Sequence, residues 1–168
     1  MGCRALSRPE RNTESDVALE LACFEFDGAC FAVDVTQVRE ISRCPPLARL
    51  PHAPGLIEGV VDLAGCILPI VDLGRVLGRA PIPAPESARL VVLESDGLCF
   101  GLRIPPAVEV LSVPLADVEA LPALAAQAGY EAVRAVVRRP GAAPPLVLSL
   151  EAPLERVFRS ARGQEEAA

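Results

Sequence analysis

An internal duplication is the feature of this sequence that most restricts its fold. Residues 27–35 read Asp-Gly-Ala-Cys-Phe-Ala-Val-Asp-Val and residues 96–104 read Asp-Gly-Leu-Cys-Phe-Gly-Leu-Arg-Ile, an offset of 69 residues. In both places alternating apolar residues flank an Asp-Gly dipeptide, which supplies the positive φ angles of a tight hairpin turn. The sequence therefore predicts two related β-hairpins, over residues 19–33 and 89–104.

The duplication extends beyond these hairpins. At the same offset Glu40-Ile41 falls opposite Glu109-Val110. A second pair of hairpins is predicted at 60–72, around Ala64-Gly65, and at 133–150, around residues 139–141. Two copies are too few for a solenoid, which needs about three or more repeats. We therefore expect two small β-barrels packed against each other, joined by a Pro-rich crossing at 79–88.

Composition supports a folded, mostly β protein of one domain. Of the 168 residues 51% are hydrophobic and 23% are charged, a balance that excludes a disordered chain. Apolar runs bounded by turn residues recur along the body, as in barrels built of short strands. We expect one domain over 17–162, with subdomains at about 17–80 and 88–150. The polar ends, 1–16 and 163–168, are predicted to be frayed.

Three short helices are expected between or after the strands. Asp72 is a suitable N-cap for a helix over 73–77, which Gly78 would end. Residues 117–128 are Ala-rich and are followed by Gly129, which predicts a second helix. A third, over 151–161, has Pro153 in its first turn.

Charge and cysteine usage exclude several classes of partner. The chain has 22 acidic and 16 basic residues, all of the latter Arg, and its only dense basic cluster is Arg134, Arg138 and Arg139; nucleic-acid binding is not expected. No apolar run approaches the ~18 residues of a membrane span, and no signal peptide is visible, so a cytoplasmic location is expected. The six cysteines lack the paired spacing of metal sites, and the four that lie inside apolar runs are of the kind that usually behaves as a small buried hydrophobe.

Few residues are available for catalysis. The only histidine, His52, lies in a Pro-rich loop without a neighbouring Ser or Cys, and no phosphate-binding loop or nucleophile elbow is present. Asp62 and Asp72 flank one hairpin and could act as an acid–base pair, although Asp72 has a simpler role as a helix cap. We expect no enzyme, cofactor or metal site, and keep a small hydrolase as a remote alternative.

The remaining candidates for function are surfaces. Val38-Arg39-Glu40-Ile41 combines apolar residues with charges, as interaction surfaces of small barrels do. Val38 and Ile41 could equally fill the core. The sequence pattern leaves both interpretations open.

Residues 57–73, Ile-Glu-Gly-Val-Val-Asp-Leu-Ala-Gly-Cys-Ile-Leu-Pro-Ile-Val-Asp-Leu, resemble the signature of the CheW-like domain of bacterial chemotaxis coupling proteins. Supporting matches occur at 31–41 and at 108–113, and the resemblance covers about 17–158. It implies two five-stranded SH3-like barrels and a scaffold without catalytic activity, located at membrane receptor arrays. The implied partners are the regulatory domain of a CheA-type histidine kinase and the cytoplasmic tip of methyl-accepting receptors.

The resemblance also implies site residues. Contact with the kinase would involve Val35, Val38 and Ile41. Contact with the receptor would fall at the groove between the barrels and involve Glu40, Gly59, Ala64, Gly65 and Val110. A side chain at position 59 would obstruct a closely approaching partner, and a strand bulge is the alternative explanation of this glycine.

Two positions depart from the family pattern. Ala64 stands where the family has Arg, so a guanidinium that could contact the receptor is missing. An alternative function is therefore a scaffold with lost or altered receptor contact, in a chemosensory system that controls pili, development or transcription. Ser149 stands where the family often has Asp before the last helix.

Overall fold

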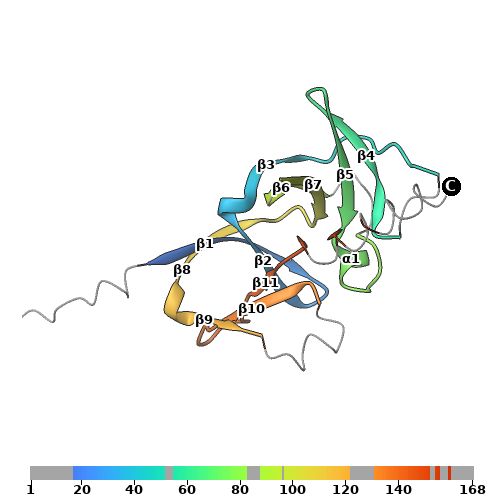
Figure 1. Ribbon diagram of the computed structural model, residues 1–168. Helices are drawn as coiled ribbons and strands as arrows, with labels where there is room; N and C mark the ends of the chain where they lie inside the picture. The colour runs from blue at the N-terminus through green and yellow to red at the C-terminus, as the bar shows by residue number, and fades with distance from the viewer. Residues whose placement is uncertain are drawn as a thin grey trace, which may run out of the picture.

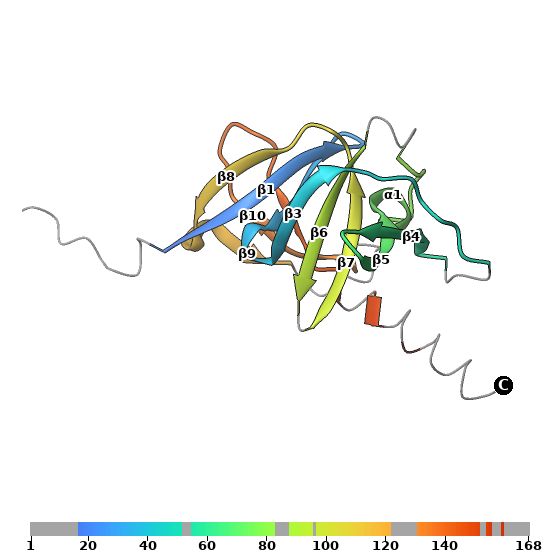
Figure 2. The ribbon, with the colours of Figure 1, turned by 90° about the horizontal axis from the view of Figure 1, so that it is seen from above.

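The computed structural model describes residues 17–51, 55–82, 88–95, 97–121, 131–151, 154–155 and 159. These residues form two β-sheets that lie side by side, with short helical segments between strands (Figures 1 and 2). The predicted frayed ends, 1–16 and 163–168, lie outside the described residues, as does His52.

The mostly β fold is confirmed, with sheets of six and five strands. Sheet A contains, in spatial order, β8 (Glu109–Pro114), β1 (Ala18–Phe26), β2 (Ala29–Asp34), β11 (Leu146–Leu148), β10 (Val133–Val137) and β9 (Val118–Ala120). Sheet B contains β3 (Val38–Arg43), β6 (Arg89–Ser95), β7 (Leu98–Ile104), β5 (Cys66–Asp72) and β4 (Ile57–Leu63). The counterpart of β9 in sheet B is a single bridge between Ala48 and Val60.

Both Asp-Gly hairpins predicted from the duplication are present. β1 pairs with β2, and β6 pairs with β7, each in antiparallel orientation. In the first turn Asp27 and Gly28 have φ angles of 51° and 79°. Two successive positive φ angles are those of a type I′ turn, whose twist matches that of the flanking strands.

Each sheet draws strands from both repeats, which differs from the expected division at about 80 and 88. Sheet B is formed by the continuous segment 38–104, whereas sheet A combines β1 and β2 with the strands that follow residue 108. The third strand of each repeat pairs with the first hairpin of the other: β3 with β6, and β8 with β1. Each sheet also contains one parallel pair that joins the two repeats, β5 with β7 in sheet B and β2 with β11 in sheet A. Parallel neighbours need a long crossover between them, so such partners come from distant parts of the chain.

The strand registers of the two repeats match residue by residue. The equivalent pairs in β4–β5 and β10–β11 are Ile57–Val71 with Val133–Leu148, and Gly59–Ile70 with Ala135–Val147. Both hairpins have a bulge at the same place, where Glu58 stands in one and Arg134 in the other. By the same alignment Asp72 is equivalent to Ser149, and the offset of the first hairpins makes Arg103 equivalent to Asp34.

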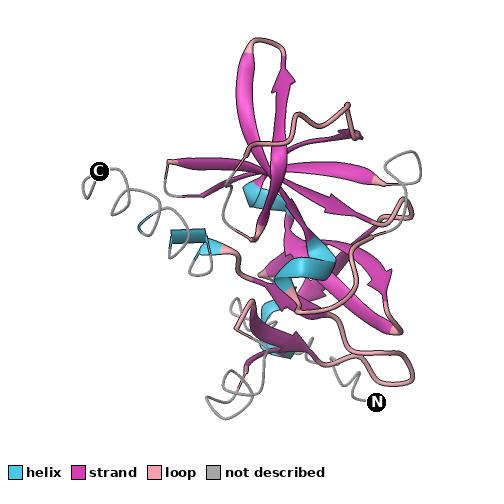
Figure 3. Cartoon of the chain, turned by 90° about the vertical axis from the view of Figure 1, so that its right-hand side faces the viewer, coloured by secondary structure: helices cyan, strands magenta, loops and turns pink. Residues whose placement is uncertain are grey.

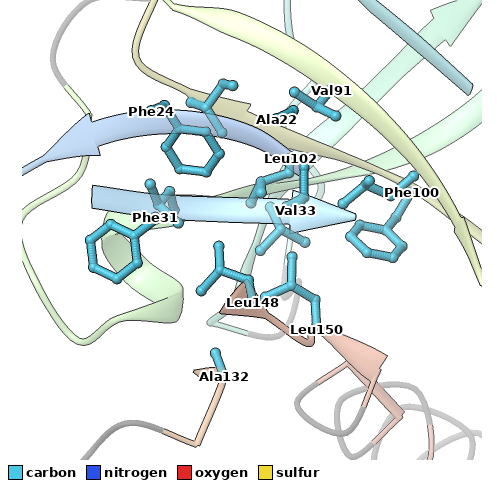
Figure 4. Close-up of a cluster of buried hydrophobic side chains, with 14 of the residues drawn as sticks. Ala22, Phe24, Phe31, Val33, Val91, Phe100, Leu102, Ala132, Leu148 and Leu150 are labelled. Atoms are coloured by element: carbon cyan, nitrogen blue, oxygen red, sulfur yellow. The ribbon is translucent and has the colours of Figure 1, made fainter. Parts of the chain in front are cut away.

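Three clusters of buried apolar side chains hold the sheets together. One lies within sheet A and another within sheet B, so each sheet curls into a barrel, here barrel A and barrel B. The third, the central cluster, packs the barrels against each other and includes Phe31 and its equivalent Phe100 (Figure 4). Alternation along β1 explains the division, since Cys23 faces the inside of barrel A while Ala22 and Phe24 face barrel B.

The helix predicted after Asp72 is present as α1 (Leu73–Val76). The Asp72 carboxylate caps it by accepting a hydrogen bond from the backbone N–H of Arg75. Gly78 follows the helix with a φ angle of 67°. In the predicted helix at 151–161, the described residues are helical.

The prediction of an Ala-rich helix over 117–128 is wrong for its first residues. Asp117 ends a 3-10 turn, η4 (Leu115–Asp117), and the next three residues form β9. β9 pairs with β10, with Ala120 opposite Ala135. Strand pairing in the tertiary structure thus overrides the local helix propensity. The remainder of that prediction, from residue 122, lies outside the described residues.

Candidate protein-interaction surface

Two edge strands carry an exposed apolar residue at equivalent positions. Ile41 in β3 is 40% exposed, and Val110 in β8 is 62% exposed. β3 ends sheet B and β8 ends sheet A. Among the described residues, therefore, one side of each strand is not paired within its sheet, and such an edge can pair with another chain.

The strand register places both side chains on the face that the barrels share. Ile41 lies opposite Val91, and Val110 lies opposite Ala22. Directly opposite residues in antiparallel strands have their side chains on the same face, and Val91 and Ala22 both belong to the central cluster. Ile41 and Val110, which we call the seam pair, therefore extend the apolar surface between the barrels out to solvent.

The other two predicted kinase-contact residues are less accessible. Val35, in the 3-10 turn η2 (Val35–Gln37), and Val38, at the start of β3, are half-buried and pack against the central cluster. The structure thus separates the two interpretations of the Val38–Ile41 segment. Val38 contributes to the core, and Ile41 contributes to the surface.

Glu40 is exposed but belongs to the opposite face of β3. It lies opposite Val92, a residue of the barrel B interior, and a bulge at Arg39 precedes it. The residues predicted to contact the receptor therefore do not share one face. Val110 groups with Ile41, and Glu40 lies on the other side of its strand.

Gly59 is buried, and the reason for this glycine is internal. A Cβ atom at this position would lie 2.6 Å from the backbone oxygen of Ala48. That oxygen accepts a hydrogen bond of 2.9 Å from the backbone N–H of Val60. The chain itself makes the close approach, beside the β4 bulge, and this accounts for a glycine at position 59 without a partner.

Ala64 and Gly65 form the exposed tip of the β4–β5 hairpin, which extends away from the rest of the molecule (Figures 1 and 3). Their φ angles are 51° and 83°. The Asp62 carboxylate accepts a hydrogen bond of 2.9 Å from the Gly65 N–H and so stabilises the turn. A side chain at position 64 is therefore held at the outermost point of the hairpin.

Asp62 and Asp72 are too far apart to act as an acid–base pair. Asp62 lies opposite Ile67, near the tip, whereas Asp72 is five residues further along β5. At ~3.3 Å per residue this separation is about 16 Å. The acid–base site on which the hydrolase alternative depends is therefore not formed by these two residues.

Asp72 belongs instead to a buried cluster of charges. The Arg103 guanidinium lies 2.9 Å from the carboxylate of Asp72 and 2.9 Å from that of Glu58. It also donates a hydrogen bond to the Ile82 carbonyl, and the Ile82 N–H donates to Asp72. The cluster thereby attaches the segment before β6 to barrel B. Sequence analysis missed it, although a single charge within the apolar run of β7 was a signal.

The described part of the chain has neither a metal-binding cluster nor a membrane-spanning helix. Its His, Cys, Asp and Glu residues do not form a group of three or more that could hold a metal ion. None of its helices has the length and apolar character needed to cross a membrane.

The family model of the CheW-like domain matches residues 20–158. The chain belongs to the CheW-like family. This is the family of the chemotaxis coupling and scaffold proteins, and the resemblance of residues 57–73 is confirmed.

Several known proteins are similar to this CheW-like chain. The chemotaxis protein CheW of Rhizobium meliloti is 31% identical over 106 residues, which are 63% of this chain and 68% of that protein. A probable CheW of Rhizobium etli is 32% identical over 56% of this chain and 61% of its own length, and protein FrzA of Myxococcus xanthus is 28% identical over 82% and 80%. The crystal structure of the scaffolding protein TtCheW from Thermoanaerobacter tengcongensis has the same fold, with a TM-score of 0.70 and 19% identity over 83% of this chain and 89% of that one.

One departure from the CheW-like pattern now has a physical explanation. Asp72 in barrel B is paired with Arg103, but the position equivalent to Arg103 in barrel A is Asp34. A carboxylate at position 149 would therefore lie beside a like charge. Ser149 avoids this repulsion, and its N–H donates a hydrogen bond of 2.7 Å to the Ala132 carbonyl.

Proposed function

We propose that this CheW-like chain is a non-catalytic adaptor that couples methyl-accepting chemoreceptors to a CheA-type histidine kinase at membrane receptor arrays. The observation that carries the proposal is the seam pair, Ile41 and Val110. Two equivalent edge strands, one per barrel, present an apolar residue to solvent on the face where the barrels meet. A scaffold that binds two partners needs two such edges.

The kinase contact is assigned to the β3 edge. Ile41 supplies the exposed apolar side chain, and Val35 and Val38 support the strand from the central cluster. The regulatory domain of a CheA-type kinase resembles the CheW-like fold, so its barrel can pack against this edge. An apolar side chain at the centre of such an interface contributes most when it is fully desolvated.

The receptor contact is assigned to the β8 edge and the hairpin tip. Val110 is the most accessible apolar residue on the seam, while Ala64 and Gly65 project from barrel B. An apolar seam of this kind can accept an amphipathic helix of a partner. Glu40 lies on the other face of β3, the face of Val92, where it can act only through a second contact.

Calorimetric titration tests the kinase contact. We expect the wild-type chain to bind the regulatory domain of a CheA-type kinase from the same genome with one-to-one stoichiometry and micromolar affinity. Ile41→Glu should weaken this binding at least tenfold, since it places a charge in the apolar contact. Leu115→Glu is the matched control, because Leu115 is 50% exposed but lies in η4, off the seam. Equal binding by both variants would remove β3 from the interface.

A receptor pull-down tests the other edge. Methyl-accepting receptors inserted in nanodiscs should retain the wild-type chain and Ile41→Glu, and should lose Val110→Glu. Circular dichroism on each variant checks that the fold is intact. Retention of Val110→Glu would show that β8 is not the receptor edge.

A second candidate function rests on Ala64, which lacks the guanidinium of the family pattern. The chain would then be a CheW-like scaffold with altered receptor contact, serving another chemosensory output. Ala64→Arg places the missing group at the exposed hairpin tip. A gain in receptor retention favours this candidate, and unchanged retention favours the standard adaptor.

A further inference from the structure

The mouth of barrel A contains a cavity that the proposed adaptor function does not use. Its volume is about 420 Å³, which lies within the range of small-molecule sites. Its walls include two cysteines, Cys23 from β1 and Cys30 from β2, and three charged groups, those of Glu25, Glu109 and Arg139. Among the described cysteines, these are the two that line this cavity.

The hairpin register brings the two thiols together. Cys23 lies opposite Ala32, and Cys30 lies opposite Glu25. The cysteines are therefore diagonal neighbours on the same face of the hairpin, and both line the cavity. The Cys23 sulfur also lies 3.9 Å from the carbonyl oxygen of Leu21.

We propose that Cys23 and Cys30 form a thiol modification site, at which a hydroperoxide that enters the cavity oxidises the pair to a reversible disulfide. Cys30 is the thiol that attacks, since it is half-buried, whereas Cys23 is buried. The proposal is independent of the receptor and kinase contacts.

The reaction has two steps. The Cys30 thiolate attacks one peroxide oxygen, the O–O bond breaks, and the hydroxide that leaves takes up a proton to become water. The Cys30 sulfenic acid is then attacked by the Cys23 sulfur, the S–O bond breaks, and the leaving hydroxide takes the Cys23 proton as a second water. Two electrons pass from the sulfurs to the peroxide, and one S–S bond forms.

The surroundings of the pair distinguish its two members. The pKa of the Cys23 thiol is raised to about 12, mainly by burial, with smaller contributions from the Cys30 thiol and the Glu109 carboxylate. Burial also raises the pKa of Cys30, as do Glu25 and Glu109, but the neighbouring Cys23 thiol and the Arg139 guanidinium lower it. Cys30 is thus favoured as the thiolate, and its oxidation should accelerate as the pH rises.

The strand geometry makes the disulfide easy to reduce. Diagonal neighbours in an antiparallel pair have Cα atoms about 7–8 Å apart, whereas disulfides usually join Cα atoms about 4.4–6.8 Å apart. Closure therefore requires the two cysteines to move toward each other along the paired strands, which strains the bond. Strained disulfides are the labile ones, which suits a reversible site better than a structural crosslink.

Barrel B provides an internal control. Cys99 is equivalent to Cys30, but the position equivalent to Cys23 is Val92. Cys99 therefore has the same place in its hairpin without a thiol partner across the strand. The chain thus compares a paired and an unpaired cysteine in one molecule.

Peptide mapping of the full-length chain tests the proposal. The reduced protein is treated with hydrogen peroxide, alkylated and cut with trypsin, which releases residues 12–39 with both cysteines and no other. We expect this peptide to lose two hydrogen atoms and to take up no alkylating agent. A glutamate-specific protease then cuts after Glu25, between the cysteines, and the two fragments should stay joined until dithiothreitol is added.

The result with the wild-type protein shows whether the disulfide forms, and the variants show which cysteines form it. Two alkylated thiols in the 12–39 peptide, or added oxygen without a crosslink, would overturn the proposal. Cys30→Ser should abolish the crosslink, whereas Cys99→Ser should leave it unchanged. Loss of the crosslink in both variants would show that the fold of the hairpin, and not the thiol pair, controls the reaction, and would also overturn it.

Discussion

Barrels A and B place opposite charges at equivalent positions. Arg103 in β7 and Asp34 in β2 both meet the bulge residue of a second hairpin, Glu58 at 2.9 Å for Arg103 and Arg134 at 3.6 Å for Asp34. In barrel B the side chains of Arg103 and Asp72 are 4% and 0% exposed. In barrel A the Arg134 side chain is 47% exposed. Both repeats therefore have an ion pair at the same position, but the acidic and basic partners are exchanged and only the pair in barrel B is buried.

The difference shows what a duplicated fold retains. Strand pairing and bulge geometry bring these positions together in both barrels, whichever charges they carry. Burial depends on what covers the pair, and in barrel B the Ile82 segment binds both Arg103 and Asp72. A buried pair is costly to break, whereas an exposed pair contributes little. The two barrels should accordingly respond very differently to loss of the same charge.

The largest expected effect is that of Arg103→Met. It leaves the buried carboxylates of Asp72 and Glu58 without a counter-charge, which should lower the free energy of unfolding by about 3–5 kcal/mol. The matched variant Arg134→Met removes an exposed partner and should cost less than about 1 kcal/mol. Urea unfolding measures both, and equal losses would contradict the comparison.

Ser149→Asp gives barrel A the carboxylate that barrel B has at Asp72. Because Asp34 stands where barrel B has Arg103, we expect a loss of about 1–2 kcal/mol from like-charge repulsion. Asp34→Asn keeps the oxygen that accepts the Thr36 N–H and should recover most of the loss in the double variant. A double-mutant cycle by urea unfolding measures this coupling, and additive effects would separate the two positions.

The thiol of Cys23 should make stability depend on pH in the alkaline range. The folded state holds a proton that the unfolded thiol releases near pH 9. The free energy of unfolding should therefore be constant below pH 9 and fall as the pH rises toward 12, by no more than about 1.4 kcal/mol per pH unit. The chain has no Lys, whose own titration in this pH range would otherwise overlap with that of the thiol.

Cys23→Val copies Val92 of barrel B into barrel A and should reduce this slope, while the raised pKa values of Cys30 and Cys44 leave a smaller one. Unfolding of wild type and variant, followed from about pH 8 to about pH 10.5, checks the prediction. An unchanged slope in Cys23→Val would assign the dependence to other groups.

The smallest effect concerns the hairpin tips. Ala64 has the same φ angle of 51° as Asp27, but Ala lacks the local hydrogen bonds with which Asp and Asn tolerate this conformation. Ala64→Asn creates an Asn-Gly type I′ turn, and we expect a gain of about 0.5 kcal/mol. Thermal unfolding measures it, and a loss would show that the Ala64 turn is not strained.

Prediction succeeded where chemistry is local and failed where contacts are distant. The Asp-Gly turns, the Asp72 cap and the equivalence of Ile41 with Val110 follow from neighbouring residues. The start of the helix predicted over 117–128 failed because β10 offers β9 its backbone hydrogen bonds. The sequence also does not show that Ala48 lies against Gly59.

The sequence by itself determined the hairpins, their registers and the duplication, because turn residues and alternation act over a few positions. It also contained the CheW-like signature at 57–73. Only the tertiary structure decided which hairpins share a barrel, since parallel pairing of β2 with β11 and of β5 with β7 joins segments far apart in the chain. For the same reason it alone decided that Arg103 is buried and that Ile41 is not, because exposure depends on which distant segment covers each strand.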